Sequence, residues 1–88
     1  MRYSVETTPR FEREYRKLDR YTQKMLKAWI GKNLMDCEDP RLHGKALAGD
    51  KKGKWRYRIG DYRLLCEIED DRLVILALRI GHRRDIYR

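Results

Sequence analysis

The 88-residue chain is short enough for one compact domain, spanning residues 1–88, and it is strongly basic. Its 22 lysines and arginines outnumber its 14 aspartates and glutamates, which favours a polyanionic partner. No apolar run approaches the roughly 18 residues that a membrane-spanning helix needs, and Glu6 and Pro9 interrupt any signal-peptide pattern. A cytoplasmic protein without membrane association is therefore expected, with Cys37 and Cys66 as reduced thiols.

Two helices are predicted in the first half of the chain. Residues 3–6 alternate apolar and polar side chains, which predicts a short strand before them. Thr8 is placed to cap a first helix, because the following proline tolerates the first helical position. Apolar residues then recur at helical spacing up to Leu18 and, after the capping residue Asp19, again up to Leu34. The short connection between the two segments predicts an antiparallel helical hairpin.

The last third of the chain predicts a sheet. Alternating segments flank Gly60 and Asp61, which is the pattern of a two-residue hairpin turn. The final segment is almost continuously apolar, which is typical of a strand covered on both faces. The predicted fold is α+β with the order β-α-α-β-β-β, an N-terminal strand and a helical hairpin packed on a mainly antiparallel sheet. The expected strands are residues 55–59, 62–69 and 72–80, after a loop at residues 35–54.

Hairpin register places arginines together on one face of this sheet. If residues 60–61 form the turn, Arg58 lies directly opposite Arg63, with Cβ atoms roughly 5 Å apart, and Arg56 alternates onto the same face. Like charges opposed across a ladder repel, but an anion between them turns the repulsion into attraction, and guanidinium groups bind phosphate bidentately. The alternative is an ordinary solvated surface, with a carboxylate such as Glu67 nearby.

A second basic cluster occupies residues 81–84, directly after the last predicted strand. That strand should run back beside the strand at residues 62–69, so that its end returns to the level of Arg63. Arg83 and Tyr87 are therefore expected to reach the arginine face, although a frayed basic terminus is the alternative. Residues 41–64 hold eight basic and two acidic residues, and residues 79–88 hold four basic and one acidic, so the excess charge is concentrated in these two segments.

Several segments form a recognisable combination: the sequence GKWRYRIGDYRL at residues 53–64, IGHRRDIY at residues 80–87, and residues 11–18, 39–41 and 47–49. Together they resemble the RelE family of toxins from type II toxin–antitoxin systems, within the RelE/ParE superfamily. The likeness implies a compact RelE/ParE fold, ribosome-dependent cleavage of mRNA in the A site, and neutralisation by a small antitoxin.

The resemblance also implies which residues form the site. Better-known RelE enzymes have lysines at the first two matched positions, and a family arginine near residues 47–49 is replaced here by Ala48. The matched catalytic positions are Arg56, Arg58, Arg63, Arg83 and Tyr87. The basic residues expected to contact RNA or the ribosome are Lys45, Lys51, Lys52, Lys54 and Arg84.

The implied reaction is attack of a ribose 2′-OH on the adjacent phosphate, which gives a cyclic phosphate and a free 5′-OH. Arginines suit the stabilisation of the extra negative charge, but their pKa, above about 12, makes them poor proton acceptors. Histidine, with an ordinary pKa near 6.5, suits proton transfer, so His82 is the catalytic candidate, with Tyr87 as its competitor. Contact of His82 with RNA is the alternative.

The sequence indicates that His43 is a solvated loop residue. Neither a metal nor a cofactor is expected, because the histidines and cysteines lack metal-ligand spacing and no glycine-rich phosphate loop is present.

The expected partners follow from the charge and the resemblance. They are a cognate RelB-like antitoxin with an acidic helix or strand, mRNA, and the 70S ribosome at its A site, including 16S rRNA. Two other functions stay open: a ParE-like protein that poisons DNA gyrase without cutting RNA, and a non-catalytic RNA-binding domain. A gyrase poison has no need of a convergent arginine site, which favours the endoribonuclease.

Overall fold

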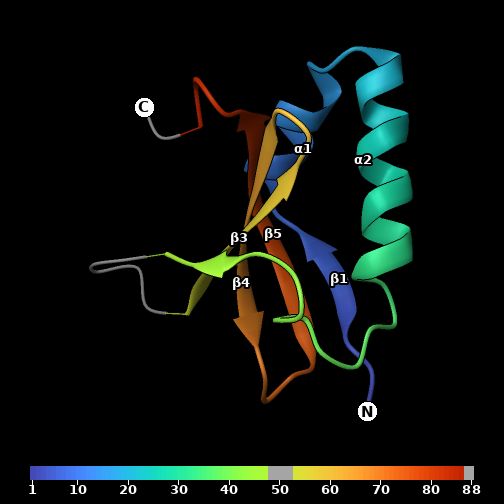
Figure 1. Cartoon of the computed structure of the whole chain (residues 1–88), viewed down its shortest axis with the longest axis vertical. Helices are drawn as coiled ribbons and strands as arrows, with labels where there is room; N and C mark the ends of the chain where they lie inside the picture. Colours follow the sequence, from blue (N-terminus) through green and yellow to red (C-terminus); the bar gives the residue numbers. More distant parts are fainter. Residues whose placement is uncertain (48–52, 87–88) are drawn as a thin grey trace.

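Two helices pack on one face of a five-stranded sheet, as the computed structural model in Figure 1 shows. The structure describes residues 1–47 and 53–86. The predicted α+β fold is confirmed, with one short strand added. In chain order the elements are β1 (Ser4–Thr7), α1 (Pro9–Arg16), α2 (Arg20–Asn33), β2 (Lys45–Ala46), β3 (Lys54–Ile59), β4 (Tyr62–Glu69) and β5 (Val74–His82).

Both helices begin at the predicted residues. The Thr8 side chain accepts a hydrogen bond from the Phe11 N–H at 3.1 Å, and a proline occupies the first turn of α1. Asp19 caps α2 by accepting from the Thr22 N–H at 3.2 Å. The first helix is only eight residues long and ends before Leu18, to which its apolar spacing extends, and its Phe11 and Tyr15 rings stack 5.8 Å apart.

The strand order is β1-β5-β4-β3-β2, with β1 parallel to β5 and the other neighbours antiparallel. The predicted hairpin register is confirmed, because Arg58 pairs with Arg63 and Ile59 with Tyr62 across the turn. The strand β2 lies in the segment predicted as loop. Two residues are too few to show an alternation of apolar and polar side chains, and β2 is defined by its pairing with β3.

A β-bulge divides β5. Leu65 pairs with Arg79 and Cys66 with Ala77, so Leu78 is an extra residue in β5. The bulge shifts the alternation, so that Ala77 and Ile80 are both buried although they are three residues apart. It also turns Arg79 away from the core. The outer face of β5, opposite the helices, is only partly covered, since Leu76 and Leu78 there are half-buried.

The core lies between the sheet and the helices, and the Tyr57 side chain is fully buried in it, 5.6 Å from the Trp29 ring of α2. Cys66 belongs to this core as predicted, and burial raises the pKa of its thiol, which keeps it protonated. Neither described helix is long and apolar enough to cross a membrane. The main buried side chains are Phe11, Leu26, Leu34, Tyr57, Ile59, Leu64, Cys66, Ile68, Ile75 and Ile80.

Candidate functional site

Two arginines meet at the tip of the β3–β4 hairpin. Arg58 and Arg63 are cross-strand partners on the outer face, and Gly81 of β5 pairs with Arg63 on its other side. The Arg63 Nη1 donates to the carbonyl oxygens of Gly60 at 3.0 Å and Tyr62 at 2.9 Å, which folds its guanidinium over the turn. Its other nitrogens carry three further N–H donors in a planar fork.

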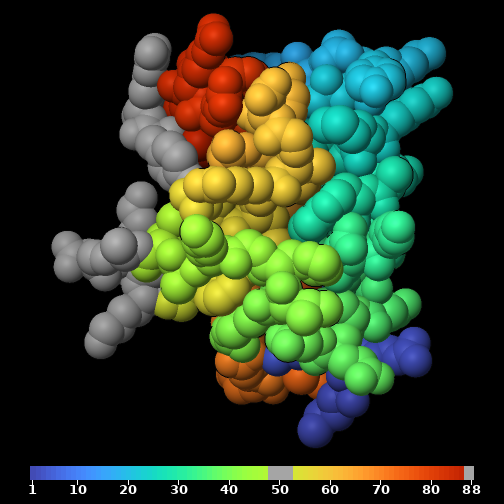
Figure 2. Space-filling view, in the orientation of Figure 1, coloured from blue at the N-terminus to red at the C-terminus, as the bar shows by residue number. Residues whose placement is uncertain are grey.

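The C-terminal turn, residues 83–86, brings a third arginine to the same end of the sheet. The Arg83 N–H donates to the Asp61 carbonyl at 2.8 Å, and its guanidinium lies 3.9 Å from the Asp61 carboxylate. In Figure 2 this turn, in red, lies against the β3–β4 turn, in amber. Arg58, Arg63 and Arg83, hereafter the arginine cluster, thus lie at the ends of three neighbouring strands, at the same end of the sheet.

Arg56 lies one layer further along β3 and is half-buried, opposite Leu65 and Lys45. Arg56 and Arg58 both line a cavity of about 430 Å³ between α2 and the loop that precedes β2. Polar and aromatic groups are mixed in its wall. The other lining residues are Trp29, Leu42, His43, Gly44 and Lys45.

His43 is the residue at this site that the sequence did not single out. Its ring packs edge-on against Trp29, with centroids 5.8 Å apart, and its carbonyl accepts a 2.6 Å hydrogen bond from the Trp55 indole. The next residue, Gly44, has φ +84° and sits so close to the β3 backbone that a Cβ there meets the Arg56 carbonyl. In the sequence, the only hint of a role for His43 was its position before a glycine and a lysine. Which side chains surround it could not be predicted, because that depends on the pairing of β2 with β3.

His82 lies elsewhere. Its ring packs edge-on against Tyr62 at 5.6 Å, and its Nδ1 accepts the Arg84 N–H at 3.2 Å. It lines a cavity of about 370 Å³ with Glu14 of α1, and not with Arg56 or Arg58. The structure therefore separates His82 from the cavity that holds the first two predicted catalytic arginines.

The remaining predicted RNA contacts have mixed surroundings. Lys45 is exposed beside the cavity of Arg56, and Arg84 is exposed on the C-terminal turn. Lys54 is ion-paired with Glu67 at 3.3 Å on the neighbouring strand. Lys51, Lys52 and Tyr87 lie outside the described residues. Within residues 1–47 and 53–86, no cluster of histidine, cysteine and acidic side chains is arranged to hold a metal ion.

The geometry suits the binding of a phosphate. Three guanidinium groups at one end of the sheet present planar, always-charged donors, and phosphate oxygens accept from such donors in pairs. The Arg63 guanidinium is held by backbone carbonyls, which leave its positive charge in place, and the Asp61 carboxylate lies 3.9 Å from the Arg83 guanidinium. The arrangement can both bind a phosphodiester and stabilise extra negative charge on it.

Comparison with known proteins identifies the family. Residues 5–87 match the ParE toxin family of type II toxin–antitoxin systems. The chain belongs to this family of toxins. It is 35% identical to Toxin RelG of Mycobacterium tuberculosis over 89 residues, which cover 100% of this chain and 99% of that protein.

Solved structures of toxin–antitoxin complexes share the fold. The toxin–antitoxin complex RelBE2 of Mycobacterium tuberculosis contains a chain that superposes with a TM-score of 0.84 and 29% identity, covering 97% of this toxin and 95% of that chain. A chain of the intact E. coli RelBE complex superposes with a TM-score of 0.74 and 24% identity, covering 91% and 95%. At that identity the E. coli likeness concerns the fold alone.

Proposed function

We propose that this toxin is an endoribonuclease that cuts mRNA in the A site of the translating 70S ribosome and so inhibits translation. The placement of Arg58, Arg63 and Arg83 at one end of the sheet carries the proposal. The 35% identity with RelG and the similarity to RelBE2 support the same family of toxins. The excess positive charge on the second half of the chain suits a site made of RNA.

In the proposed reaction a ribose 2′-OH attacks the adjacent phosphate, the bond to the 5′ oxygen of the next nucleotide breaks, and a cyclic phosphate and a 5′-OH result. The arginine cluster holds the phosphate in line and neutralises the charge that grows on its non-bridging oxygens. Arg56, one layer away, extends this positive field along β3. The mechanism draws its charge stabilisation from arginines and uses no metal.

Proton transfer is assigned to residues other than arginine, because guanidinium groups stay protonated at neutral pH. His82 and Tyr87 are the candidates from the sequence, and His43 joins them because it shares a cavity with Arg56 and Arg58. Since His82 packs on Tyr62 and lines a different cavity, His43 is the better placed of the two histidines to accept the 2′-OH proton.

The second proposed partner is an antitoxin encoded alongside, as in the RelBE complexes. On the outer face, a cavity of about 390 Å³ has an apolar floor of Leu47, Leu65 and Leu78. Basic side chains surround it: Arg10, Lys54 and Arg79. Such a surface fits an amphipathic, acidic segment of an antitoxin, whose apolar side chains would fill the floor while its carboxylates lie in the positive field of the rim, beside the exposed Arg10.

Mapping of mRNA ends after induction of the toxin tests the function. Primer extension should find new 5′ ends inside codons, only on messages that are being translated, and with a 5′-OH at each end. The match to a family of ParE toxins favours a gyrase poison as the second candidate. DNA breaks with intact mRNA would establish that candidate and refute the endoribonuclease, whereas RNA binding without cleavage would reduce the protein to a binding domain.

A further inference from the structure

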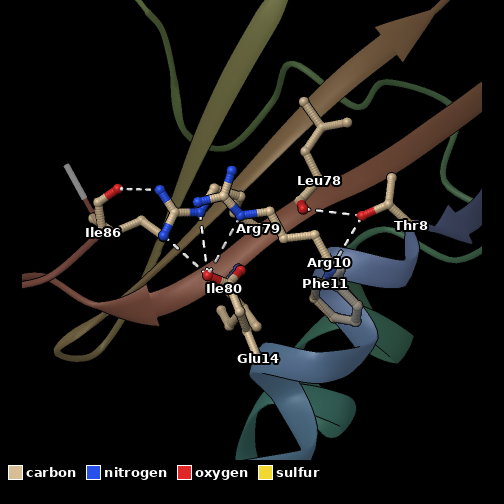
Figure 3. A network of polar contacts seen from close by, with 8 residues as sticks. All are labelled: Thr8, Arg10, Phe11, Glu14, Leu78, Arg79, Ile80 and Ile86. Atoms are coloured by element: carbon tan, nitrogen blue, oxygen red, sulfur yellow. Dashed lines mark hydrogen bonds and ion pairs between the residues drawn. The ribbon is translucent and has the colours of Figure 1, made fainter. Parts of the chain in front are cut away.

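A half-buried ion pair outside the arginine cluster joins α1 to the C-terminal turn. Arg79, the residue that the bulge turns away from the core, directs its guanidinium toward Glu14 of α1 (Figure 3). The side chains of Arg79 and Glu14 are only 22% and 23% exposed. An ion pair this sheltered from water is screened less than a surface pair.

The three nitrogens of the Arg79 guanidinium serve two acceptors. Its Nε and Nη2 donate to the Glu14 Oε2 at 3.2 and 2.9 Å, and its Nη1 donates to the Ile86 carbonyl at 3.0 Å (Figure 3). A fork of this kind fixes the carboxylate and the carbonyl relative to each other, which a point charge such as lysine does not.

Glu14 in turn anchors this unit to the sheet. Its Oε1 accepts the Ile80 N–H at 3.1 Å, on the edge of β5 beyond the last residue that β1 covers. The same edge is held at the other end of α1, where the Thr8 side chain donates to the Leu78 carbonyl at 3.0 Å. Helix α1 therefore continues the edge of the sheet in place of a strand.

The C-terminal turn is fixed at its two ends by different contacts. Arg83 is held at the hairpin through the Asp61 carbonyl. Ile86 is buried, lies beside Gly81, and is held through its carbonyl by Arg79. The Ile86 end also keeps its N–H bond to the His82 carbonyl, so loss of the Arg79 contact loosens this end without detaching it, and the turn that carries Arg83 is held less firmly in its orientation.

We infer that Arg79 is a positioning residue for the nuclease site, acting with Glu14 to hold the C-terminal turn in the orientation that the proposed cleavage needs. The inference rests on the proposed function. Arg79 itself points at a carboxylate and a carbonyl, not at the arginine cluster, so its effect on catalysis passes through the turn that carries Arg83. A misplacement near 1 Å can lower a rate about 100-fold.

The test compares Arg79→Lys with wild-type toxin in cleavage of mRNA on purified, programmed ribosomes. Lysine can keep the ion pair with Glu14, but its single Nζ cannot also replace the contact with the Ile86 carbonyl. We expect kcat to fall about 10- to 100-fold while KM changes less than about threefold, since charge is conserved. Arg72→Lys is the matched control, because Arg72 also bridges two acidic residues, Glu6 and Glu69, at the other end of β5.

Amide hydrogen exchange of the free toxin gives a second readout that does not depend on activity. The N–H groups of Asp85 and Ile86 both donate to the His82 carbonyl, and in Arg79→Lys they should exchange at least about tenfold faster, while Ile75 in the core stays protected. Glu14→Gln, which removes the charge pair and leaves Arg79 in place, should give smaller changes of the same kind.

Wild-type kcat in both variants, or unchanged exchange at Asp85 and Ile86, overturns the inference. Loss of protection at Ile75 as well would show a general structural role, which also contradicts it. A wild-type toxin that leaves mRNA intact refutes the proposed function instead, and the exchange rates then still decide whether Arg79 holds the turn.

Discussion

Arg63 shows how a turn can direct a charged side chain. Its Nη1 is committed to the carbonyls of Gly60 and Tyr62, so the guanidinium does not sample the many rotamers of a free arginine. Gly60 permits the turn, because it adopts φ +60°. Arg58 and Arg63 repel each other across the ladder, and an anion bound between them would turn this repulsion into attraction.

Removal of Arg63 or Arg83 from the arginine cluster should abolish most of the cleavage. We expect Arg63→Ala or Arg83→Ala to lower kcat about 100- to 1000-fold, the loss that follows removal of one preorganised donor to a developing negative charge. Arg16→Ala, an exposed change at the end of α1, is the control and should be neutral. Full activity in both cluster variants, with folding checked by circular dichroism, would refute the site.

The histidines should differ in their effect on the pH dependence. A histidine that accepts a proton must be neutral, so the wild-type rate should fall as the pH is lowered from 8 to 5. His43→Gln should make this profile flat and His82→Gln should preserve it, because His43 alone shares the cavity with Arg56 and Arg58. Single-turnover cleavage across this pH range is the measurement. A flat wild-type profile would exclude both histidines.

At the scale of elements, the short strand β2 is what connects the loop to the site. It pairs Lys45 with Arg56, and that pairing brings His43 to Trp29. Gly44 makes the approach possible, since its positive φ and its closeness to the Arg56 carbonyl leave no space for a side chain. The loop is thus set against β3 by backbone contacts and not by an apolar stripe.

Two glycine substitutions should have opposite effects on stability. Gly44→Ala forces a side chain into a left-handed conformation and against the β3 backbone, so it should lower the free energy of unfolding by about 2 kcal/mol or more. Gly31→Ala lies in α2 with open space around it, and it should raise the free energy of unfolding by about 0.5–1 kcal/mol. Urea denaturation measures both. A tolerated Gly44→Ala would mean that the loop is not held as described.

The elements that the sequence predicted are those whose information is local. The helix caps at Thr8 and Asp19 and the turn at Gly60 each follow from a few adjacent residues, and with them the opposition of Arg58 and Arg63. The bulge at Leu78 was not predicted, because in an unbroken apolar run the sequence does not show which residues face the helices and which face outward. The position of His82 and the role of Arg79 both depend on the part of β5 after the bulge, so hydrophobic periodicity could not predict them.

For the whole molecule, one polar network joins distant parts of the chain. Arg41 donates to both carboxylate oxygens of Asp70 at 3.0 Å, and the Tyr3 hydroxyl donates to the same group at 2.6 Å. The hydrogen bonds from Arg41 and Tyr3 hold the pKa of Asp70 below its usual range. The network ties the N-terminal residues and the loop before β2 to the β4–β5 turn.

This network should make the free energy of unfolding depend on pH in the acid range. With its pKa lowered by folding, Asp70 contributes fully above the ordinary pKa of an aspartate, near 3.9, and this contribution is lost as pH falls through the lower value in the folded state. In urea denaturation between pH 7 and 2.5, Asp70→Asn should flatten the acid part of the stability curve. Because the pair is exposed, 1 M salt should weaken the effect. An identical slope in the variant would contradict the assignment.

The parallel pairing of β1 with β5 also determines when the protein can fold during its own synthesis. Ser4 pairs with Val74 and Thr7 with Ala77, so the first strand has no partner in the sheet until residues 74–77 have been made. Arg83 is made later still. A nascent chain that has not yet reached β5 therefore lacks both the pairing of its first strand and a complete arginine cluster, so the sheet and the candidate site are completed by the same late segment of the chain.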